Sequence, residues 1–327
     1  MKFYFVRHGE SEANVLGEFS NGLNKHGLTA AGRAQAQALA LSLQTKGITR
    51  VCASPILRAA QTGEILAGAL GCPLEISPAL REYDVGVLEG TTGQAGWDLY
   101  WQVLEAWLLR GELDRRIPGG ESFLDIRARF MPFLDRLAAG SAPENVVLVG
   151  HGGTYRCMLP LALRNIDFAF ALENQMANTA AVVAETEPGG LVCREWCGAP
   201  TPDSAQPGAA ARIELVLRFN DALNAGDVDA MMAMMSEDCV FENTSPAPDG
   251  ERFSGQAAMR AFWEAFMRSS SQPRIHPEAA FAVGDQCVLR WTYTWADDQG
   301  RPGRIRGVDV YRFAGDLIAE KLSYVKG

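Results

Sequence analysis

The sequence predicts two domains of different fold class, an α/β domain in three layers with a mostly parallel sheet, and then an α+β domain. Strand-like and helix-like segments alternate over residues 1–198, whereas residues 212–327 place helices first and alternating strands afterwards. Residues 199–211 are rich in Pro, Ala, Gly and Ser and lack periodicity, which is typical of a linker. The length of 327 residues agrees with this division, since a domain usually has about 100–200 residues.

Composition and charge exclude several classes of protein. Hydrophobic residues make up 47% of the chain and charged residues 21%, so extensive disorder is excluded. The net charge of -9 argues against nucleic acid and anionic membranes as partners, because both require a dense cationic surface. We expect neither a membrane span nor a signal peptide, since no apolar run is long enough. The seven cysteines contain no CxxC pair, so we expect a reducing, cytoplasmic setting without disulfides or structural zinc.

The first domain alternates short apolar strands with helices. The expected strands are Lys2–Arg7, Arg50–Ala53, Asn145–Gly150 and Thr179–Ala184. The segment NVVLVG at 145–150 is apolar on both faces, which is typical of a strand in a parallel sheet covered by helices. We expect one helix over Thr29–Leu43, with Thr29 as N-cap, and another that begins at Ser54–Pro55 as a cap followed by proline and ends near Leu70.

Polar side chains that suit an anion follow three of these strands. The first strand runs into Arg7 and His8, the strand at 145–150 leads to His151, and the helix after the second strand carries Arg58. In open parallel sheets, ligands bind beyond the carboxyl ends of the strands. Guanidinium groups match phosphate oxygens, and the glycines after His151 allow backbone N–H groups to approach the same anion. These distant residues are therefore predicted to form one phosphate site.

Five segments in order, RHGESEAN, SPILRAAQT, LREYDVGVLEG, PGGES and VGHGGTYR, resemble the histidine phosphatase superfamily, also called phosphoglycerate-mutase-like, over residues 1–198. The resemblance implies that His8 attacks phosphorus and becomes a phosphohistidine, which water then hydrolyses. It implies that Arg7, Arg58 and His151 surround the transferring phosphoryl group. Glu82 matches the family's proton donor, which also deprotonates the attacking water. No metal or other cofactor is implied.

Other residues of these segments have supporting or structural interpretations. Asn14 stands at the family's RHGxxxxN position, and the resemblance implies that it and Gly152 bind substrate. Asn14 could instead cap the next turn. His26 is interpreted as a loop residue, and Glu121 and Ser122 as the start of a helix.

The predicted function is a metal-independent phosphomonoesterase, of the histidine acid type, that acts on a small phosphorylated metabolite. Hydrolysis is favoured over transfer between hydroxyls because a mutase must exclude water, and mutase-type segments are not evident around Gly17–Lys25 or beyond Gly90. Two alternative functions remain open: a phosphoglycerate-mutase-type phosphotransferase, and a non-catalytic protein that binds phosphorylated ligands. The segment Thr91–Pro118 is expected to cap the pocket, and we interpret its aromatic residues as packing: Trp97, Tyr100, Trp101 and Trp107.

The second domain is expected to begin with three helices and to end in strands. The expected helices are Ile213–Ala225, Val228–Met235 and Gly255–Met267. The expected strands are Ala280–Ala282, Cys287–Trp295, Arg304–Phe313 and Leu317–Tyr324. We expect Gly303, Gly307 and Gly315 at turns or bends, and His276 in an exposed loop.

Three segments of the second domain resemble the SnoaL-like group of the nuclear transport factor 2-like superfamily: RFNDALNAGDVDAMMAMMSEDCVFEN, FSGQAAMRAFWEAF and RGVDVYRFAGDLIAEKLSYV. The resemblance implies a cone of helices and curved antiparallel sheet, with a pocket for a small apolar ligand and homodimers formed through the sheet. Candidate pocket residues are Asp309, Glu242, Trp291 and Tyr311. Asp309 could be a general base, but a hydrogen-bonded structural acid is the favoured interpretation. Catalysis centred on this domain stays open without direct support.

Overall fold

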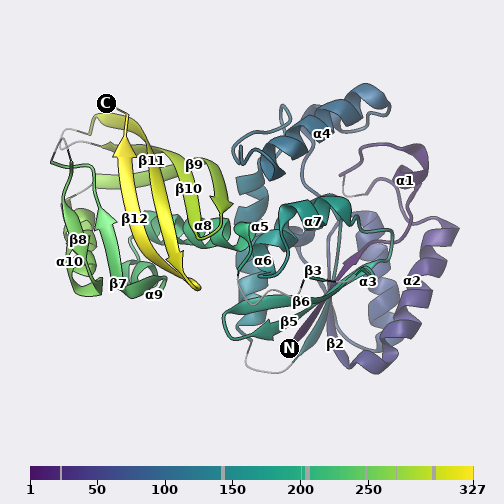
Figure 1. Ribbon diagram of the computed structural model, residues 1–327. Helices are drawn as coiled ribbons and strands as arrows, with labels where there is room; N and C mark the ends of the chain where they lie inside the picture. The colour runs from purple at the N-terminus through teal and green to yellow at the C-terminus, as the bar shows by residue number, and fades with distance from the viewer. Residues whose placement is uncertain are drawn as a thin grey trace. The chain divides into compact units, whose positions relative to one another are not determined.

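The structure, a computed structural model, describes residues 1–22, 24–140, 144–199, 201–202, 207–246, 249–269, 271–296 and 300–326 (Figure 1). The chain divides into two compact units. The first comprises Met1–Leu109 and Arg115–Asp203, and the second comprises Arg110–Asp114 and Ser204–Gly327. Among the helices of the described ranges, none has the length and apolar character needed to cross a membrane.

A six-stranded sheet of order β3-β2-β4-β1-β5-β6 forms the centre of the first unit. Four strands run parallel: β1 (Lys2–Arg7), β2 (Ile48–Ala53), β3 (Leu74–Ile76) and β4 (Asn145–Gly150). An antiparallel hairpin extends one edge with β5 (Ala181–Glu187) and β6 (Gly190–Trp196). The sheet is thus mostly parallel, as predicted.

Helices cover both faces of this sheet (Figure 1). They are α1 (Glu12–Leu16), α2 (Ala30–Leu43), α3 (Leu57–Leu70), α4 (Gln94–Leu108), α5 (Phe123–Ala138), α6 (Gly152–Ala162) and α7 (Phe168–Glu173). Along β1, Tyr4 belongs to the core that contains residues of α2 and α3, whereas Phe5 packs edge-on against Tyr155 of α6, which also contacts Phe130 of α5. Alternate side chains of one strand therefore enter two different cores, which gives the three predicted layers.

The start of α3 differs from the prediction. Thr29 does cap α2, because its hydroxyl accepts the Gly32 N–H at 3.0 Å. The helix α3, however, begins at Leu57, and Ser54 does not serve as its N-cap. The Ser54 hydroxyl instead accepts the Ile56 N–H at 3.2 Å and lies 2.9 Å from Nε2 of His151. Ser54 therefore contacts His151, which is distant in the sequence, and does not cap the helix as its sequence pattern predicted.

The second unit contains a second six-stranded sheet, of order β8-β7-β12-β11-β10-β9. Its strands are β7 (Met235–Glu242), β8 (Arg252–Ser254), β9 (Ser271–Val283), β10 (Gln286–Ala296), β11 (Pro302–Ala314) and β12 (Leu317–Val325). All neighbours pair antiparallel except β7 and β12, which are parallel. The accompanying helices are α8 (Ala209–Ala225), α9 (Val228–Ala233) and α10 (Gln256–Ser269). This arrangement confirms the predicted α+β class.

Several predicted boundaries in the second unit were wrong. The helix α8 begins at Ala209, inside the predicted linker, because three alanines favour helix once Gly208 allows it to begin. Residue 200 and residues 203–206 of that linker lie outside the described residues. The helix α9 ends at Ala233, and Met235 opens a buried strand. His276 is exposed as predicted but lies in strand β9, where it contacts the Thr294 hydroxyl at 2.9 Å.

Two glycines predicted at turns or bends lie inside strand β11. A Cβ at Gly303 would overlap the ring of Trp295, and a Cβ at Gly307 would overlap the ring of Trp291. Both indoles come from β10, in direct register with the two glycines. The glycines therefore make room for large rings on the neighbouring strand. Gly315 does occupy a turn, with φ of 60°.

We expect Gly307→Ala to destabilise the second unit by about 1–3 kcal/mol, since an added methyl must displace a buried indole. Chemical unfolding of the full chain, followed through the second-unit transition, measures this loss. In a Trp291→Leu background the same substitution should cost less but not nothing, because the smaller side chain removes the overlap with the ring while the Tyr324 carbonyl oxygen stays 2.5 Å from such a Cβ. An equal loss in both backgrounds would show that this backbone oxygen, and not the indole, is the main obstacle.

Candidate active site

The first unit brings together the four residues predicted at the ends of its strands. His8 follows β1, His151 follows β4, and Arg58 belongs to the first turn of α3. The rings of His8 and His151 have centroids 5.1 Å apart, and both side chains are buried. Arg58 contacts His8 directly, and Arg7 lies at the end of the same strand as His8. Parallel strands thus deliver residues distant in sequence to one edge of the sheet.

The hydrogen bonds of His8 define which ring nitrogen is free to react. Nδ1 lies 2.7 Å from the Gly9 carbonyl oxygen, so Nδ1 must carry the proton and donate it. Nε2 then has a lone pair, which accepts the Arg58 Nε–H at 3.1 Å. Burial, followed by the charges of Arg58 and Arg7, holds the pKa of His8 well below its usual value. The imidazole is therefore neutral at physiological pH, and its lone pair points toward the guanidinium.

His151 is also held neutral. Burial lowers its pKa well below the usual value, and the nearby charge of Arg58 lowers it further. Its Nε2 lies 2.9 Å from the Ser54 hydroxyl, while its buried Nδ1 has no hydrogen-bond partner among the described residues. Ser54 thus fixes the orientation of the ring and leaves one polar nitrogen for a ligand.

Backbone carbonyls hold both arginines in place. Arg58 is 5% exposed and donates from Nη1 to the Ser20 carbonyl oxygen at 2.7 Å. Arg7 donates from Nη1 to the Met176 carbonyl oxygen at 2.7 Å. Burial lowers the pKa of Arg58 to about 10, which still leaves this guanidinium charged near neutral pH. Burial also lowers the pKa of Arg7.

Among the described residues, no carboxylate lies within ion-pair distance of either guanidinium, and Nε of Arg7 is buried without a partner there. The charge of Glu82 acts on both arginines from a greater distance and partly opposes the effect of burial on their pKa. A buried charge without a counter-charge is costly to a fold. Two guanidiniums and two neutral imidazoles therefore form a site whose charge a dianion such as a phosphate monoester would balance.

The N-terminus of α6 completes the site. Gly152 faces Arg7, and a Cβ there would make an ordinary contact, 3.4 Å from Cδ and 3.5 Å from Nε of the arginine. A Cβ at Gly153 would lie 2.8 Å from one carboxylate oxygen of Glu82 and 2.9 Å from the other. The glycine at 153 therefore lets the first turn of the helix approach the carboxylate. The positive end of the helix dipole also favours an anion here.

Glu82 is bound to that same helix terminus rather than to either histidine. Its Oε1 accepts hydrogen bonds from the backbone N–H of Thr154 at 2.6 Å and from the hydroxyl of Thr154 at 2.9 Å. It also accepts the backbone N–H of Tyr83, the next residue, at 3.2 Å. Among the described residues, its Oε2 accepts one hydrogen bond, from the Gly153 N–H at 2.9 Å. The carboxylate is therefore fixed at the first turn of α6, and Oε2 has fewer partners there than Oε1.

Asn14 forms a link around the backbone of the site. It is the third residue of α1 and forms a capping box with Ser11, as the alternative interpretation of this residue held. Its Oδ1 also accepts the Asn178 side-chain N–H at 3.2 Å, and Asn178 donates to the His8 carbonyl oxygen at 3.0 Å. Asn14 is thus tied to the nucleophile loop through Asn178.

Aromatic packing ties the segment Thr91–Pro118 to the site. Tyr100 of α4 stacks on Tyr83 with centroids 5.9 Å apart, and Tyr83 follows Glu82 directly. Trp107 is buried, packs edge-on against Tyr83 and donates its indole N–H to the Arg115 carbonyl oxygen at 2.6 Å. Trp97 contacts Phe19, which is near Ser20 in the loop that binds Arg58.

Several supporting residues of the site were not predicted from the sequence. Thr62 accepts the Gly9 N–H at 3.1 Å, Asn178 binds the His8 carbonyl, and Ser54 and Thr154 fix His151 and Glu82. Ser54 and Thr154 lie inside the motif segments SPILRAAQT and VGHGGTYR, which could have drawn attention to them. Asn178 lies outside every motif, so no signal in a single sequence identifies it.

The second unit buries a charged pair in its interior. Oδ2 of Asp309 lies 2.8 Å from Nζ of Lys321, and its Oδ1 accepts the Ser323 hydroxyl at 2.7 Å. The Tyr311 hydroxyl donates to Oδ2 at 3.2 Å. The Lys321 ammonium also lies 4.9 Å from the centroid of the Phe241 ring. In contrast to the arginines of the first unit, these charges compensate each other.

The other two candidates of the second unit are Glu242 and Trp291. Glu242 is partly exposed and lies 3.5 Å from Nη1 of Arg252, on the face of β7 opposite to the buried Phe241. Strand alternation explains the outcome, because neighbouring residues point to opposite faces. Trp291 is buried over Gly307, and its indole nitrogen has no partner among the described residues.

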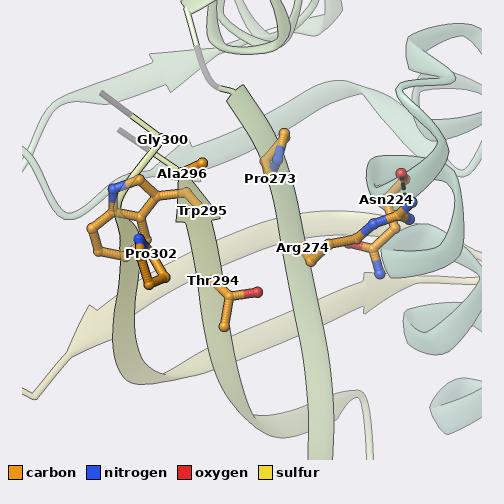
Figure 2. A pocket seen from close by; sticks show the side chains of 8 residues that line it. All are labelled: Asn224, Pro273, Arg274, Thr294, Trp295, Ala296, Gly300 and Pro302. Carbon is orange, nitrogen blue, oxygen red and sulfur yellow. Dashed lines mark hydrogen bonds between the residues drawn. The ribbon is translucent and has the colours of Figure 1, made fainter. Parts of the chain in front are cut away.

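Figure 2 shows a pocket of about 490 Å³ elsewhere in the second unit. Trp295 and Pro302 lie on one side of it, and Arg274 and Asn224 on the other. Arg274 donates to the Asn224 carbonyl oxygen at 2.9 Å. Its lining residues are Asn224, Pro273, Arg274, Thr294, Trp295, Ala296, Gly300 and Pro302. Asp309, Trp291 and Tyr311 are not among them.

Comparison with known families agrees with this geometry. The family model described as "Histidine phosphatase superfamily (branch 1)" matches residues 3–198, and the model described as "SnoaL-like domain" matches residues 216–321. Both resemblances noted in the sequence are therefore confirmed, and the second unit contains a SnoaL-like domain.

Relatives of the first unit include proteins named as mutases and as phosphatases. The chain is 37% identical over 166 residues to the "Probable phosphoglycerate mutase GpmB" of Proteus mirabilis, a match that covers 50% of this chain and 75% of the relative. The protein of the same name from Enterobacter is 36% identical over 172 residues, with the same coverage. Among solved structures, a mycobacterial glucosyl-3-phosphoglycerate phosphatase in complex with VO3 is 25% identical, with a TM-score of 0.52, and the match covers 60% of this chain and 98% of that one.

The neutral histidines predict a specific dependence of stability on pH. Because folding lowers the pKa of His8 and His151, the unfolded chain binds more protons as the pH falls below about 6.5, and the free energy of unfolding falls with it. Each histidine contributes a slope of at most about 1.4 kcal/mol per pH unit. Chemical unfolding between pH 5 and pH 7.5 measures this slope for the first unit.

The variants His8→Gln and His151→Gln should each flatten that slope, while His276→Gln, in the other unit, should retain it. The interval above pH 5 separates this effect from the protonation of ordinary carboxylates. A slope that is the same in all four proteins would show that neither buried histidine is held neutral by the fold.

Proposed function

Because the chain belongs to the histidine phosphatase superfamily, we propose that its first domain, residues 1–198, hydrolyses phosphate monoesters of small metabolites through a phosphohistidine on His8. The observation that carries the proposal is the lone pair on Nε2 of His8, which is buried beside the unpaired charges of Arg58 and Arg7. A neutral imidazole is a nucleophile, and two guanidiniums neutralise the oxygens of the group that it attacks.

In the first step, Nε2 of His8 attacks phosphorus while the bond to the ester oxygen breaks. Arg7, Arg58 and Nδ1 of His151, in its protonated tautomer, stabilise the equatorial oxygens, and the first N–H of α6, at Gly152, faces the same group. Glu82, protonated on Oε2, gives its proton to the leaving alcohol. The contacts of Glu82 with Gly153 and Thr154 support this role, since they leave only Oε2 with free capacity.

In the second step, a water molecule attacks the phosphohistidine. Glu82, now a carboxylate stabilised by the N-terminus of α6, accepts the proton of that water. The phosphorus–nitrogen bond breaks, and His8 regains its lone pair as inorganic phosphate departs. The positive charge that phosphoryl transfer requires comes from side chains and a helix terminus, so we propose that the reaction is independent of metals and other cofactors.

Transfer to a second hydroxyl is the alternative outcome of the same intermediate. The relatives from Proteus mirabilis and Enterobacter, which are named as probable phosphoglycerate mutases, favour it. The mycobacterial phosphatase favours hydrolysis. The two reactions differ only in whether water or an alcohol reaches the phosphohistidine. A protein that binds phosphorylated ligands without turnover would require an incomplete set of reactive groups, and this site contains a nucleophile and an acid.

We expect the full chain to release phosphate from an aryl phosphate in the presence of a chelator, and His8→Ala to abolish that release. His276→Ala, which changes a histidine of the other unit, should leave the rate unaltered. A radioactive phosphoryl label that is stable to alkali and labile to acid should appear on the unaltered protein and not on His8→Ala.

Addition of glycerol distinguishes the two reactions of the intermediate. If hydrolysis dominates, most of the label leaves as inorganic phosphate even in the presence of the alcohol. Predominant recovery of the label as glycerol phosphate would support a transferase instead. Turnover that persists in His8→Ala would remove the nucleophile from the proposal.

We propose that the second domain, residues 212–327, is accessory and forms a homodimer through the outer face of its sheet. Apolar residues lie in one transverse row across four strands, Phe281 opposite Val288, Val288 opposite Val310, and Val310 opposite Leu322. Phe281 is 56% exposed, and the neighbouring Val283 is 75% exposed. Such a row on a solvent-facing sheet supports association.

The pocket beside Trp295 and Pro302 supports the proposal that the second domain binds a small apolar ligand. The seven unpaired cysteines support a cytoplasmic location.

Phe281→Lys should convert the dimer to a monomer, because it places a charge at the most exposed end of the apolar row, on the edge strand β9. Sedimentation velocity of the full chain measures the change. The matched control is Leu41→Lys, which alters an exposed leucine of α2 and should retain the dimer. Sedimentation of the unaltered protein as a monomer at micromolar concentration would contradict the proposal.

A further inference from the structure

A short segment between two stretches of the first unit belongs to the second unit. This segment is Arg110–Asp114, and we call it the strap. It follows the end of α4 at Leu108 and Leu109, and the first unit resumes at Arg115. The chain therefore leaves the first unit and returns to it within the strap, in addition to the connection that precedes α8.

The strap binds the edge of the second-unit sheet through its backbone. Strand β9 is an edge strand of that sheet. Its Ala280 N–H donates to the Gly111 carbonyl oxygen at 3.0 Å, and the Asp114 N–H donates to the Glu278 carbonyl oxygen at 3.4 Å. Ala280 is only 1% exposed, so its N–H would be costly to leave without an acceptor. The strap supplies that acceptor and covers part of the edge, as an added strand would.

The contact with β9 requires glycine at position 111 for two separate reasons. The φ of Gly111 is 65°, in the left-handed region that favours glycine. A Cβ there would also lie 2.0 Å from the Ala280 carbonyl oxygen, which is a backbone atom and cannot turn aside as a side chain can. The Gly111 carbonyl oxygen accepts the Leu113 N–H at 2.9 Å as well, which closes a tight turn. Local conformation and close approach to β9 therefore depend on the same residue.

Within the first unit, residues on both sides of the strap connect to the neighbour of Glu82. The indole N–H of Trp107, near the end of α4, donates to the Arg115 carbonyl oxygen at 2.6 Å. The same indole packs edge-on against Tyr83 with centroids 5.3 Å apart, and Tyr100 of α4 stacks on Tyr83. Glu82 accepts the Tyr83 N–H at 3.2 Å. Because buried rings are closely packed, a displacement of Trp107 must also displace Tyr83 and the peptide that it shares with Glu82.

We propose that the strap couples the second unit to the phosphate site, because it holds the end of α4 and, through Trp107 and Tyr83, fixes the position of Glu82. The inference rests on the proposed function, in which Glu82 gives a proton to the leaving alcohol, and it adds a role for the second domain. The strap has two states, bound to β9 and released, and only the bound state holds α4 in place. Its residues act through Trp107 and are positioning residues.

Gly111→Ala should release the strap in the full chain. The Ala280 N–H should then exchange with deuterated solvent roughly tenfold faster, because it loses its acceptor. Gly71→Ala is the matched control, since Gly71 has the same φ of 65° and a Cβ there would meet no described atom within 4 Å. It imposes the same backbone strain away from β9 and should leave the exchange of Ala280 unaltered. Equal exchange rates in Gly111→Ala and in the unaltered protein would overturn the inference.

The effect on the phosphate site should depend on the leaving group. Phenol is a poorer leaving group than 4-nitrophenol and therefore depends more on a proton from Glu82. Gly111→Ala should lower kcat/KM for phenyl phosphate roughly fivefold more than kcat/KM for 4-nitrophenyl phosphate. A general loss of folded protein would lower both values equally, and Gly71→Ala should leave their ratio unaltered. Faster exchange at Ala280 together with an unchanged ratio would refute the coupling.

Ala280→Pro tests the same contact without a change in the strap. Proline removes the N–H that Gly111 accepts, and edge strands tolerate proline where the ladder does not need that N–H. The Asp114 N–H should exchange faster in this variant, and the ratio of the two kcat/KM values should fall as in Gly111→Ala. If phosphate release does not depend on His8, the proposed function fails, while the exchange rates still test whether the strap binds β9.

Discussion

Two guanidinium charges without an ion-paired carboxylate among the described residues, buried against two neutral imidazoles, are the constraint on which the architecture of the first unit depends. In the described part of the chain, backbone carbonyls accept hydrogen bonds from Arg7 and Arg58, the lone pair of His8 accepts another from Arg58, and the charge of Glu82 acts on both arginines without direct contact. Such an arrangement opposes folding, because desolvated charge is costly unless it is paired. The fold tolerates it because a packed three-layer core surrounds the site, and a dianionic ligand would offset the charge. The cost of this charge is therefore localised at the proposed phosphate site.

The helix α6 positions several of the residues that form the site. His151 precedes it, its first N–H groups bind Glu82, and Gly153 leaves the space that the Glu82 carboxylate occupies. A single rigid element thus sets the relative positions of an imidazole and a carboxyl group. This dependence explains the glycine at 153, where a Cβ would overlap Glu82 and Tyr83.

The two units treat buried charge in opposite ways. In the second, Asp309 and Lys321 compensate each other, and Ser323 and Tyr311 satisfy the remaining capacity of the carboxylate. In the first, the arginines lack any such partner among the described residues. A satisfied pair can hold a fold together without a ligand, whereas an unsatisfied pair of like charges requires one. This contrast favours the first domain as the location of phosphoryl chemistry and agrees with an accessory second domain.

The sequence by itself determined the two fold classes, the parallel strands that end in Arg7, His8 and His151, and the anionic character of the ligand. These features follow from local patterns, since apolar runs define buried strands and the side chains after them share one edge of the sheet. Tertiary structure alone decided that Ser54 orients His151 instead of capping a helix, that Gly307 accommodates an indole inside a strand, and that Glu242 faces away from Asp309. Each of these outcomes depends on a partner distant in the chain, and the spacing of residues in one sequence does not identify which partner will be near.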